Sequence, residues 1–207
     1  MRRSGIQLIS IMACLAIQAA PALSWSAPES PAQLIKVDQQ VYVTNDSKPG
    51  WTPSQDQIQA VQKVVRDYLA AQDHDRYAGA FNLMTPSYRN ARPLSQLSDE
   101  VREFNVLAGR VQQRQILRVT WTKDPADPPT PGVYAFVDLK SRFADVDRHC
   151  GSIVLYQEPS GGDFLVLHER SYFIDNSDAS EIAHKLSDGG LKAAWAKVSS
   201  ACQNLPG

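Results

Sequence analysis

Three consecutive antiparallel strands are predicted between Thr130 and Asp175, and this segment constrains the fold of the 207-residue chain more than any other. Five of the six odd positions from Val133 to Phe143 are apolar, an alternation typical of a strand with one buried face. The next run, Ile153 to Tyr156, is apolar on both faces, which indicates a central strand. Glycines in the segment Ser160–Asp163 tolerate the positive φ of a tight turn, so a hairpin leads into the third strand.

The third of these strands carries a mixed polar and aromatic face. A period of two places these residues together on it: Phe164, Val166, His168, Arg170 and Tyr172. Such a face could line a cleft that orients a polar ligand, with a buried aspartate as a candidate general base. The alternative is that His168 and Arg170 form the solvated half of a partly exposed strand. The candidate pocket residues are Tyr77, Trp121, Tyr134, Asp138, His168, Arg170 and Tyr172.

Helices and one more strand flank these three strands. At each helix start a Ser, Thr or Asp can accept a hydrogen bond from a free N–H group, and apolar residues follow with the helical period. The predicted helices begin at Thr52, Asp73, Ser98 and Asp178, the third ends at Gly109, the last pauses at Asp188–Gly190, and the additional strand spans Arg114–Thr122. The pattern predicts an α+β fold.

The first residues have the three parts of a secretory signal peptide. Two arginines follow Met1, residues 6–20 form a short apolar core, and Ala22–Ser24 is a small-x-small cleavage site. Ser24–Ser26 is a second candidate site, and Ile11–Cys14 weakly resembles a lipobox. The apolar core is too short to span a membrane, so we expect export to the periplasm or beyond, with no integral span after cleavage.

Removal of the signal leaves two cysteines, Cys150 and Cys202. In a compartment that oxidises thiols, a disulfide between them is the expected arrangement. It would close a loop of about fifty residues, which the chain-entropy description of disulfides values at about 4 kcal/mol. The alternative is two unpaired thiols.

Composition and motifs exclude several classes of function. A net charge of -1 with 21% charged residues gives no reason to expect a nucleic-acid partner. The sequence contains no metalloprotease, dinucleotide-binding, phosphate-loop or EF-hand motif, so we expect no cofactor and no metal. Asp145, Asp147 and His149 alternate, but with Arg148 among them they are more typical of a solvated hairpin end. His149 and Cys150 are neighbours on a strand and face opposite ways, so a thiolate nucleophile is not expected.

Several short motifs in the middle of the chain together resemble those of a known family. They are Leu107–Gly109, Arg114, Pro131–Tyr134, Phe143 and Tyr172–Ile174. With these motifs the chain resembles the DUF4019-like family of exported bacterial proteins of unknown function, over roughly residues 64–175. Phe81 and Phe164 stand where that family tends to have tryptophan. The resemblance implies a nuclear-transport-factor-2-like, or cystatin-like, cone: N-terminal helices packed on a curved antiparallel sheet of about four strands, followed here by a C-terminal helix. It implies no established reaction or ligand.

The predicted organisation is a signal peptide (1–24), an extended arm (25–51) with one alternating run at Leu34–Val43, a cone-type domain (52–176) and a helical tail (177–207). We expect a non-catalytic domain that binds an unknown small molecule or a periplasmic protein. Because the cone fold also hosts enzymes, the alternative is an isomerase, hydratase or lyase of the ketosteroid-isomerase type, with Asp138 as base and Tyr134 or Tyr172 as donor. A purely structural or assembly role stays open.

Overall fold

The computed structural model describes residues 34–36, 41–126 and 130–202, and the proposed signal peptide lies outside these ranges. A mixed, six-stranded sheet forms the centre of the fold, in the order β1-β3-β4-β5-β6, with β2 also paired to β3. The two short strands run parallel to β3 and the four long ones are antiparallel. The strands are β1 Leu34–Lys36, β2 Tyr42–Val43, β3 Val111–Lys123, β4 Val133–Phe143, β5 Val146–Gln157 and β6 Leu165–Asp175.

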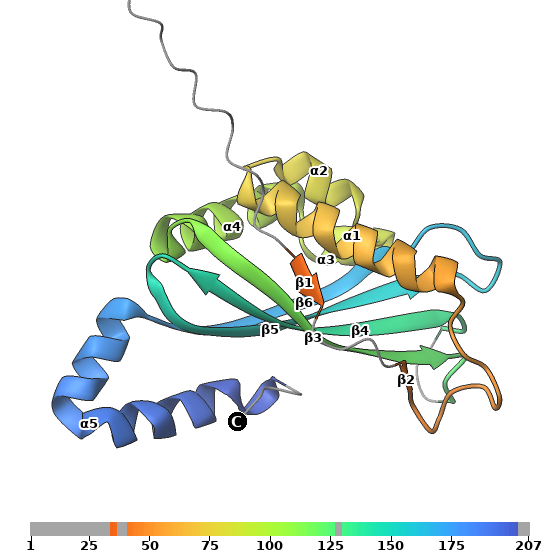
Figure 1. Ribbon diagram of the computed structural model, residues 1–207. Coiled ribbons are helices and arrows are strands. Elements are labelled where there is room, and N and C mark those ends of the chain that lie inside the picture. The colour runs from red at the N-terminus through yellow and green to blue at the C-terminus, as the bar shows by residue number, and fades with distance from the viewer. Residues whose placement is uncertain (1–33, 37–40, 127–129, 203–207) are drawn as a thin grey trace, which may run out of the picture.

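Helices cover both faces of this sheet (Figure 1). Four of them precede β3 in the chain and lie on one face, whereas the long C-terminal helix lies on the other. The helices are α1 Gln55–Asp73, α2 Tyr77–Asn82, α3 Pro86–Ala91, α4 Leu94–Ala108 and α5 Asn176–Val198. The predicted α+β class is therefore confirmed. Among the helices of the described residues, none is long and apolar enough to cross a lipid bilayer.

The main core lies between α1–α4 and the sheet face that they cover. Val61, Val65 and Tyr68 of α1 are fully buried there, and they meet the fully buried Ala135 and Val137 of β4. These sheet residues come from the odd positions of β4, as the alternation predicts. A separate apolar cluster, formed by Ile174, Ala179 and Leu191, lies under α5 on the other face.

Some predicted helix boundaries are wrong. Ser54, not Thr52, caps α1: its hydroxyl accepts from the Gln57 N–H (3.2 Å), and the Gln57 side chain accepts from the Ser54 N–H (3.0 Å). The helix expected to begin at Asp73 begins at Tyr77, because α1 continues through Asp73. Two more boundaries differ: α3 follows the N-cap Thr85 and was not predicted, and α4 starts at Leu94 rather than at Ser98.

A bulge in β6 changes which residues face the helices. Val154 pairs with His168, but the next residue, Leu155, pairs with Val166, so Leu167 is an extra residue on β6. The alternation therefore reverses at Leu167. Phe164 and Val166 lie in the main core on the helix side. The prediction that these two share a face with the polar side chains of β6 is wrong, since His168, Arg170 and Tyr172 lie on the α5 side.

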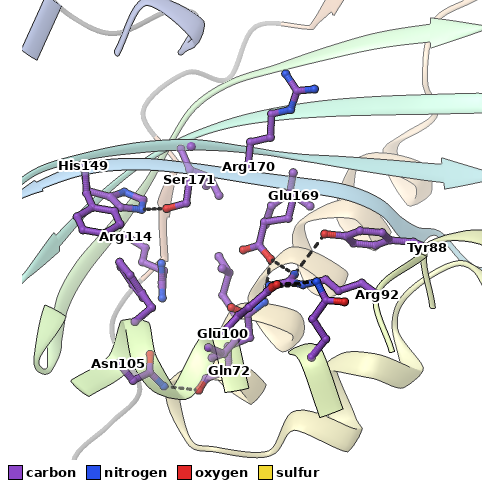
Figure 2. Close-up of a pocket in the computed structure, with 18 of the residues that line it drawn as sticks. Gln72, Tyr88, Arg92, Glu100, Asn105, Arg114, His149, Glu169, Arg170 and Ser171 are labelled. Carbon is purple, nitrogen blue, oxygen red and sulfur yellow. Dashed lines mark hydrogen bonds and ion pairs between the residues drawn. The ribbon is translucent and has the colours of Figure 1, made fainter. Parts of the chain in front are cut away.

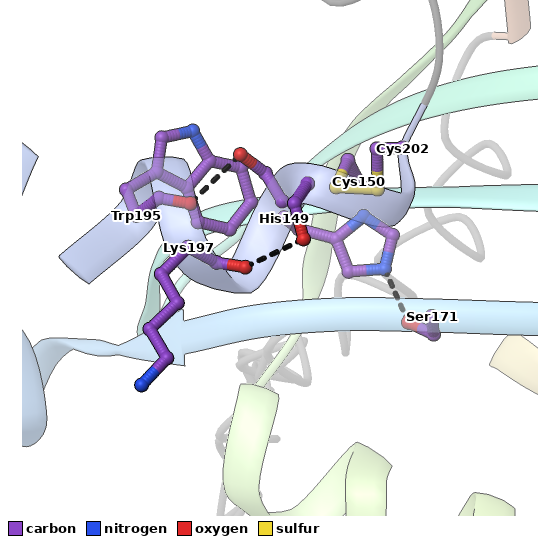
Figure 3. Close-up of a disulfide and its surroundings, with 8 residues drawn as sticks. His149, Cys150, Ser171, Trp195, Lys197 and Cys202 are labelled. Atoms are coloured by element: carbon purple, nitrogen blue, oxygen red, sulfur yellow. Dashed lines mark hydrogen bonds between the residues drawn. A yellow bond between two sulfur atoms is a disulfide. The ribbon is translucent and has the colours of Figure 1, made fainter. Parts of the chain in front are cut away.

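The C-terminal segment is tied to the centre of the sheet by a disulfide between Cys150 and Cys202 (Figure 3). Their Cα atoms are 6.2 Å apart, and the predicted pairing is confirmed. The helix predicted to begin at Asp178 begins at Asn176, because the Asp175 side chain caps α5 by accepting from the Asp178 N–H (2.8 Å). A break in this helix is present, but at Ser187 (φ 65°) rather than at the predicted Asp188–Gly190, which are helical.

Candidate functional site

A cavity of about 420 Å³ lies between the helices α1, α3 and α4 and the sheet (Figure 2). Its size is within the usual range of small-molecule sites. The apolar part of its wall includes Leu69, Val101, Phe104, Leu139, Ile153 and Phe173, and the polar part includes Gln72, Tyr88, Arg92, Glu100, Arg114, His149, Glu169 and Ser171. Exposed lining residues on α3 and α4, such as Ala91 and Gln96, mark the side on which the cavity meets solvent.

Two small residues, Gly151 and Ser171, form the deepest part of the sheet surface that lines the cavity. Gly151 of β5 pairs with Ser171 of β6, between the larger pairs that Ile153 and His149 make with the same strand. A Cβ atom on Gly151 would lie 2.5 Å from the backbone oxygen of Arg170, so the strands can approach here only around a glycine. The sheet therefore has a hollow where neighbouring positions carry bulky side chains.

Glu169 carries the negative charge at the centre of the site. It extends from β6 into the pocket (Figure 2), and its Oε2 accepts from the Tyr68 hydroxyl (2.8 Å) and the Gln72 amide (3.1 Å). Arg92 approaches the same oxygen at 3.4 Å. The other oxygen, Oε1, has no hydrogen-bond partner in the described part of the chain, and 17% of the Glu169 side chain is exposed. Burial, followed by the Glu169 charge, raises the pKa of Tyr68 well above its usual value, so Tyr68 stays a donor.

Arg92 is a single cation shared by two carboxylates. Besides Glu169, it forms an ion pair with Glu100 (2.7 Å) and donates to the Tyr88 hydroxyl (3.2 Å). Partial burial alone would raise the pKa of Glu100, but hydrogen bonds from Gln96 and Arg92 hold it below its usual value. Glu100 is therefore held as a carboxylate next to Arg92.

Arg114 forms a second, self-contained ion pair. Two of its nitrogens donate to the carboxylate of Asp73, and Nη1 donates to the Ser141 hydroxyl (3.1 Å). Its guanidinium also lies 5.3 Å from the ring centre of Phe143. Both charged side chains are about nine-tenths buried. This pair therefore contributes no net charge to the cavity.

His149 is neutral and buried, with 6% of its surface exposed. Its Nε2 is 2.7 Å from the Ser171 hydroxyl (Figure 3), whereas its Nδ1 is buried and has no hydrogen-bond partner among the described residues. Burial, followed by the nearby charge of Arg114, lowers the pKa of His149 to about 3. The imidazole thus adds a polar but uncharged group to the cavity wall.

The predicted pocket residues lie at several different places. Trp121 packs in the main core against Phe164, with ring centres 6.0 Å apart. Tyr77, on α2, donates its hydroxyl to Asp75 (2.5 Å) beside a shallow depression that α2 and α4 share. Neither residue lines the cavity described above.

The other five predicted residues alternate toward the α5 side of the sheet and lie only partly together, and the ring of His168, on the edge strand β6, lies 5.9 Å from the Tyr88 ring of α3. Tyr134 is close to Tyr156 at one end of that face, whereas Asp138 is buried opposite Ser152 on β5. Arg170 donates to the His168 ring (2.8 Å). Of the seven, only Arg170 touches the cavity, and its side chain points away from it (Figure 2).

The sequence interpretation missed the polar residues that do line the cavity. Glu169 stands between His168 and Arg170, and its place on the helix side depends on the bulge at Leu167. One signal was present: Gly151 lies inside a predicted central strand, and glycine inside a strand marks a bulge or a close approach. In the described ranges no three His, Cys, Asp or Glu side chains are grouped to hold a metal ion.

Comparison with known proteins gives one match. A family described as "Protein of unknown function (DUF4019)" matches residues 64–168, a span that runs from α1 to β6 and includes most of the cavity wall. No curated protein and no solved structure matches the chain. The family match covers half of the sequence, so the chain belongs to the DUF4019 family of proteins of unknown function.

Proposed function

We propose that this protein is exported and binds a small ligand, without catalysing a reaction, in the cavity between α1, α3, α4 and the sheet. The observation that carries the proposal is the cavity itself: it combines apolar walls with the Glu169 carboxylate, one oxygen of which has no partner in the described chain. Sites of this kind, largely apolar with a few fixed polar groups, are typical of small-molecule binding.

Rigid placement of the polar groups supports binding. Glu169 is held by donors from Tyr68 and Gln72 of α1 and by Arg92, which follows α3. A carboxylate fixed in this way offers a ligand one defined acceptor and loses little conformational freedom on binding.

Export and the type of fold are supported by other observations than the cavity. The N-terminal sequence has the parts of a signal peptide, and the disulfide between Cys150 and Cys202 suits an oxidising compartment. We also propose that the fold is of the nuclear-transport-factor-2-like cone type. Four helices over one face of a four-stranded antiparallel ribbon support this assignment.

The enzymatic alternative receives no support from the geometry. Asp138 is on the sheet face opposite the cavity. Tyr172 pairs with Cys150 of the intervening strand, so two strand spacings, about 10 Å, separate it from β4. The Tyr134 hydroxyl donates instead to the Thr130 carbonyl (2.6 Å). The geometry therefore pairs neither tyrosine with Asp138.

A fragment screen by thermal denaturation tests the proposal on protein purified after expression of the full chain. Ala91→Trp places a large side chain at the exposed mouth of the cavity, and Ala193→Trp makes the same change on an exposed position of α5. Compounds that raise the melting temperature of the wild type should do so for Ala193→Trp and not for Ala91→Trp. An empty screen, or hits that Ala91→Trp leaves unchanged, would refute binding in this cavity.

A further inference from the structure

We infer that the cavity selects small organic cations, meaning a protonated amine carried on an apolar body. This inference rests on the proposed function, since it names the ligand class of the same cavity. Its basis is the balance of charges around the cavity, the Glu169 oxygen that no described residue bonds, and the apolar walls on either side.

The charges facing the cavity leave one negative charge unmatched. Arg114 is matched by Asp73, and both are about nine-tenths buried. Within residues 41–126 and 130–202, Arg92 is the one cation paired with the two carboxylates Glu169 and Glu100. The other titratable groups on the wall do not alter this count: His149 is neutral, Tyr88 keeps its proton because burial raises its pKa, and the side chain of Arg170 points away (Figure 2). A monovalent cation would therefore neutralise the site, whereas an anion would raise the imbalance.

The hydrogen-bonding groups with spare capacity also favour a donor on the ligand. All three bonds to Glu169 go to Oε2, which leaves Oε1 as an acceptor without a partner in the described chain. An ammonium group has three donors and no acceptor, so it complements a carboxylate oxygen.

The rest of the wall fits an apolar body. Leu139 and Ile153 come from the sheet, and Phe104 of α4 packs edge-on against Phe173 of β6 with ring centres 5.2 Å apart. Aromatic faces also attract cations held next to them. An amine on a phenyl or short alkyl group would place its charge at Glu169 and its body against these side chains.

Three probes of nearly equal size and different charge test the inference by isothermal titration calorimetry: phenethylamine, 2-phenylethanol and 3-phenylpropanoate. The amine should bind about 10- to 100-fold more tightly than the alcohol, the ratio expected for a hydrogen bond to a charged group, and the carboxylate should not bind. Glu169→Gln keeps the size of the side chain and removes its charge, so it should abolish the preference for the amine. Glu158→Gln, a change at an exposed carboxylate outside the cavity, should preserve that preference.

The outcomes separate this inference from the proposed function. If the alcohol or the carboxylate binds as tightly as the amine, and Ala91→Trp abolishes that binding, the cavity binds ligands but does not select cations, and the inference is refuted. If none of the three probes binds, the inference is refuted as well, and the fragment screen decides the proposed function separately. Should Glu169→Gln fail to fold, the order of the three affinities in the wild type decides the question.

Discussion

Acid should destabilise this protein through His149, and His149→Gln should remove that sensitivity. The imidazole is buried, and burial together with the Arg114 charge lowers its pKa to about 3 from the usual 6.5. Between these two pKa values the unfolded chain binds a proton that the folded chain excludes. The contribution of neutral His149 to the free energy of unfolding is therefore fully present above pH 6.5 and is lost as the pH falls from 6.5 toward 3.

The expected magnitude follows from the two pKa values. Each pH unit inside that window removes about 1.4 kcal/mol from the free energy of unfolding. Between pH 7 and pH 5 the loss assigned to His149 is about 2 kcal/mol, since only the part below pH 6.5 contributes. Carboxylates that titrate over the same range lower the stability of the wild type and of His149→Gln equally. The difference between the two losses therefore measures the effect of His149 alone.

Urea unfolding followed by tryptophan fluorescence at pH 7 and pH 5 provides the assay. The wild type should lose about 2 kcal/mol more than His149→Gln between the two pH values. His184→Gln, a change at an exposed histidine on α5, should lose as much as the wild type. Equal losses in the wild type and His149→Gln would show that the imidazole is solvated or charged in the folded state, and would refute the reasoning.

Three further predictions concern the fold and its compartment. Cys202→Ser should lower the free energy of unfolding by about 4 kcal/mol, because the disulfide closes a loop with a sequence separation of 52; equal urea midpoints with and without it would contradict this. Gly109→Ala should lower the free energy of unfolding by at least about 1 kcal/mol, since φ is 65° and the new Cβ would lie 2.3 Å from the Asp145 side chain. In the control Gly189→Ala the nearest atom to the new Cβ, the Ser187 hydroxyl oxygen, is 3.7 Å away, so this change should be neutral or stabilising in the same assay. N-terminal sequencing of the exported protein should begin near Trp25, and an intact Met1 in a cytoplasmic product would contradict export.

The sheet was predictable where alternation is uninterrupted. The predicted bounds of β4, Val133 to Phe143, agree with the structure because five of its six odd positions are apolar and no inserted residue shifts them to the other face. The two short parallel strands on β3 were only partly foreseen, as one run at Leu34–Val43, since two or three residues are too few to show a period. The start of α4 was missed because its N-cap, Pro93, makes no side-chain hydrogen bond, while Ser98, five residues later, is of a residue type that often caps helices.

The candidate site was less predictable than the fold. One inserted residue, Leu167, moves Glu169 into the cavity and His168 out of it, and no sequence pattern marks a bulge of that kind. Arg92 and Gln72 reach the same carboxylate from the end of α3 and from α1, so their role depends on how the helices pack. Contacts between side chains of different helices and a strand depend on tertiary structure, and the periodicity of one segment does not predict them.

Binding inside the cavity is tested most directly by amide chemical shifts of the isotope-labelled protein during titration with phenethylamine. The account predicts saturable shifts at Gly151, Glu169 and Ser171, which line the cavity, and unchanged signals at Tyr134 and Phe136 on the opposite face of the sheet. Shifts centred on Tyr134 and Phe136, or no saturable shift with any hit of the fragment screen, would contradict it.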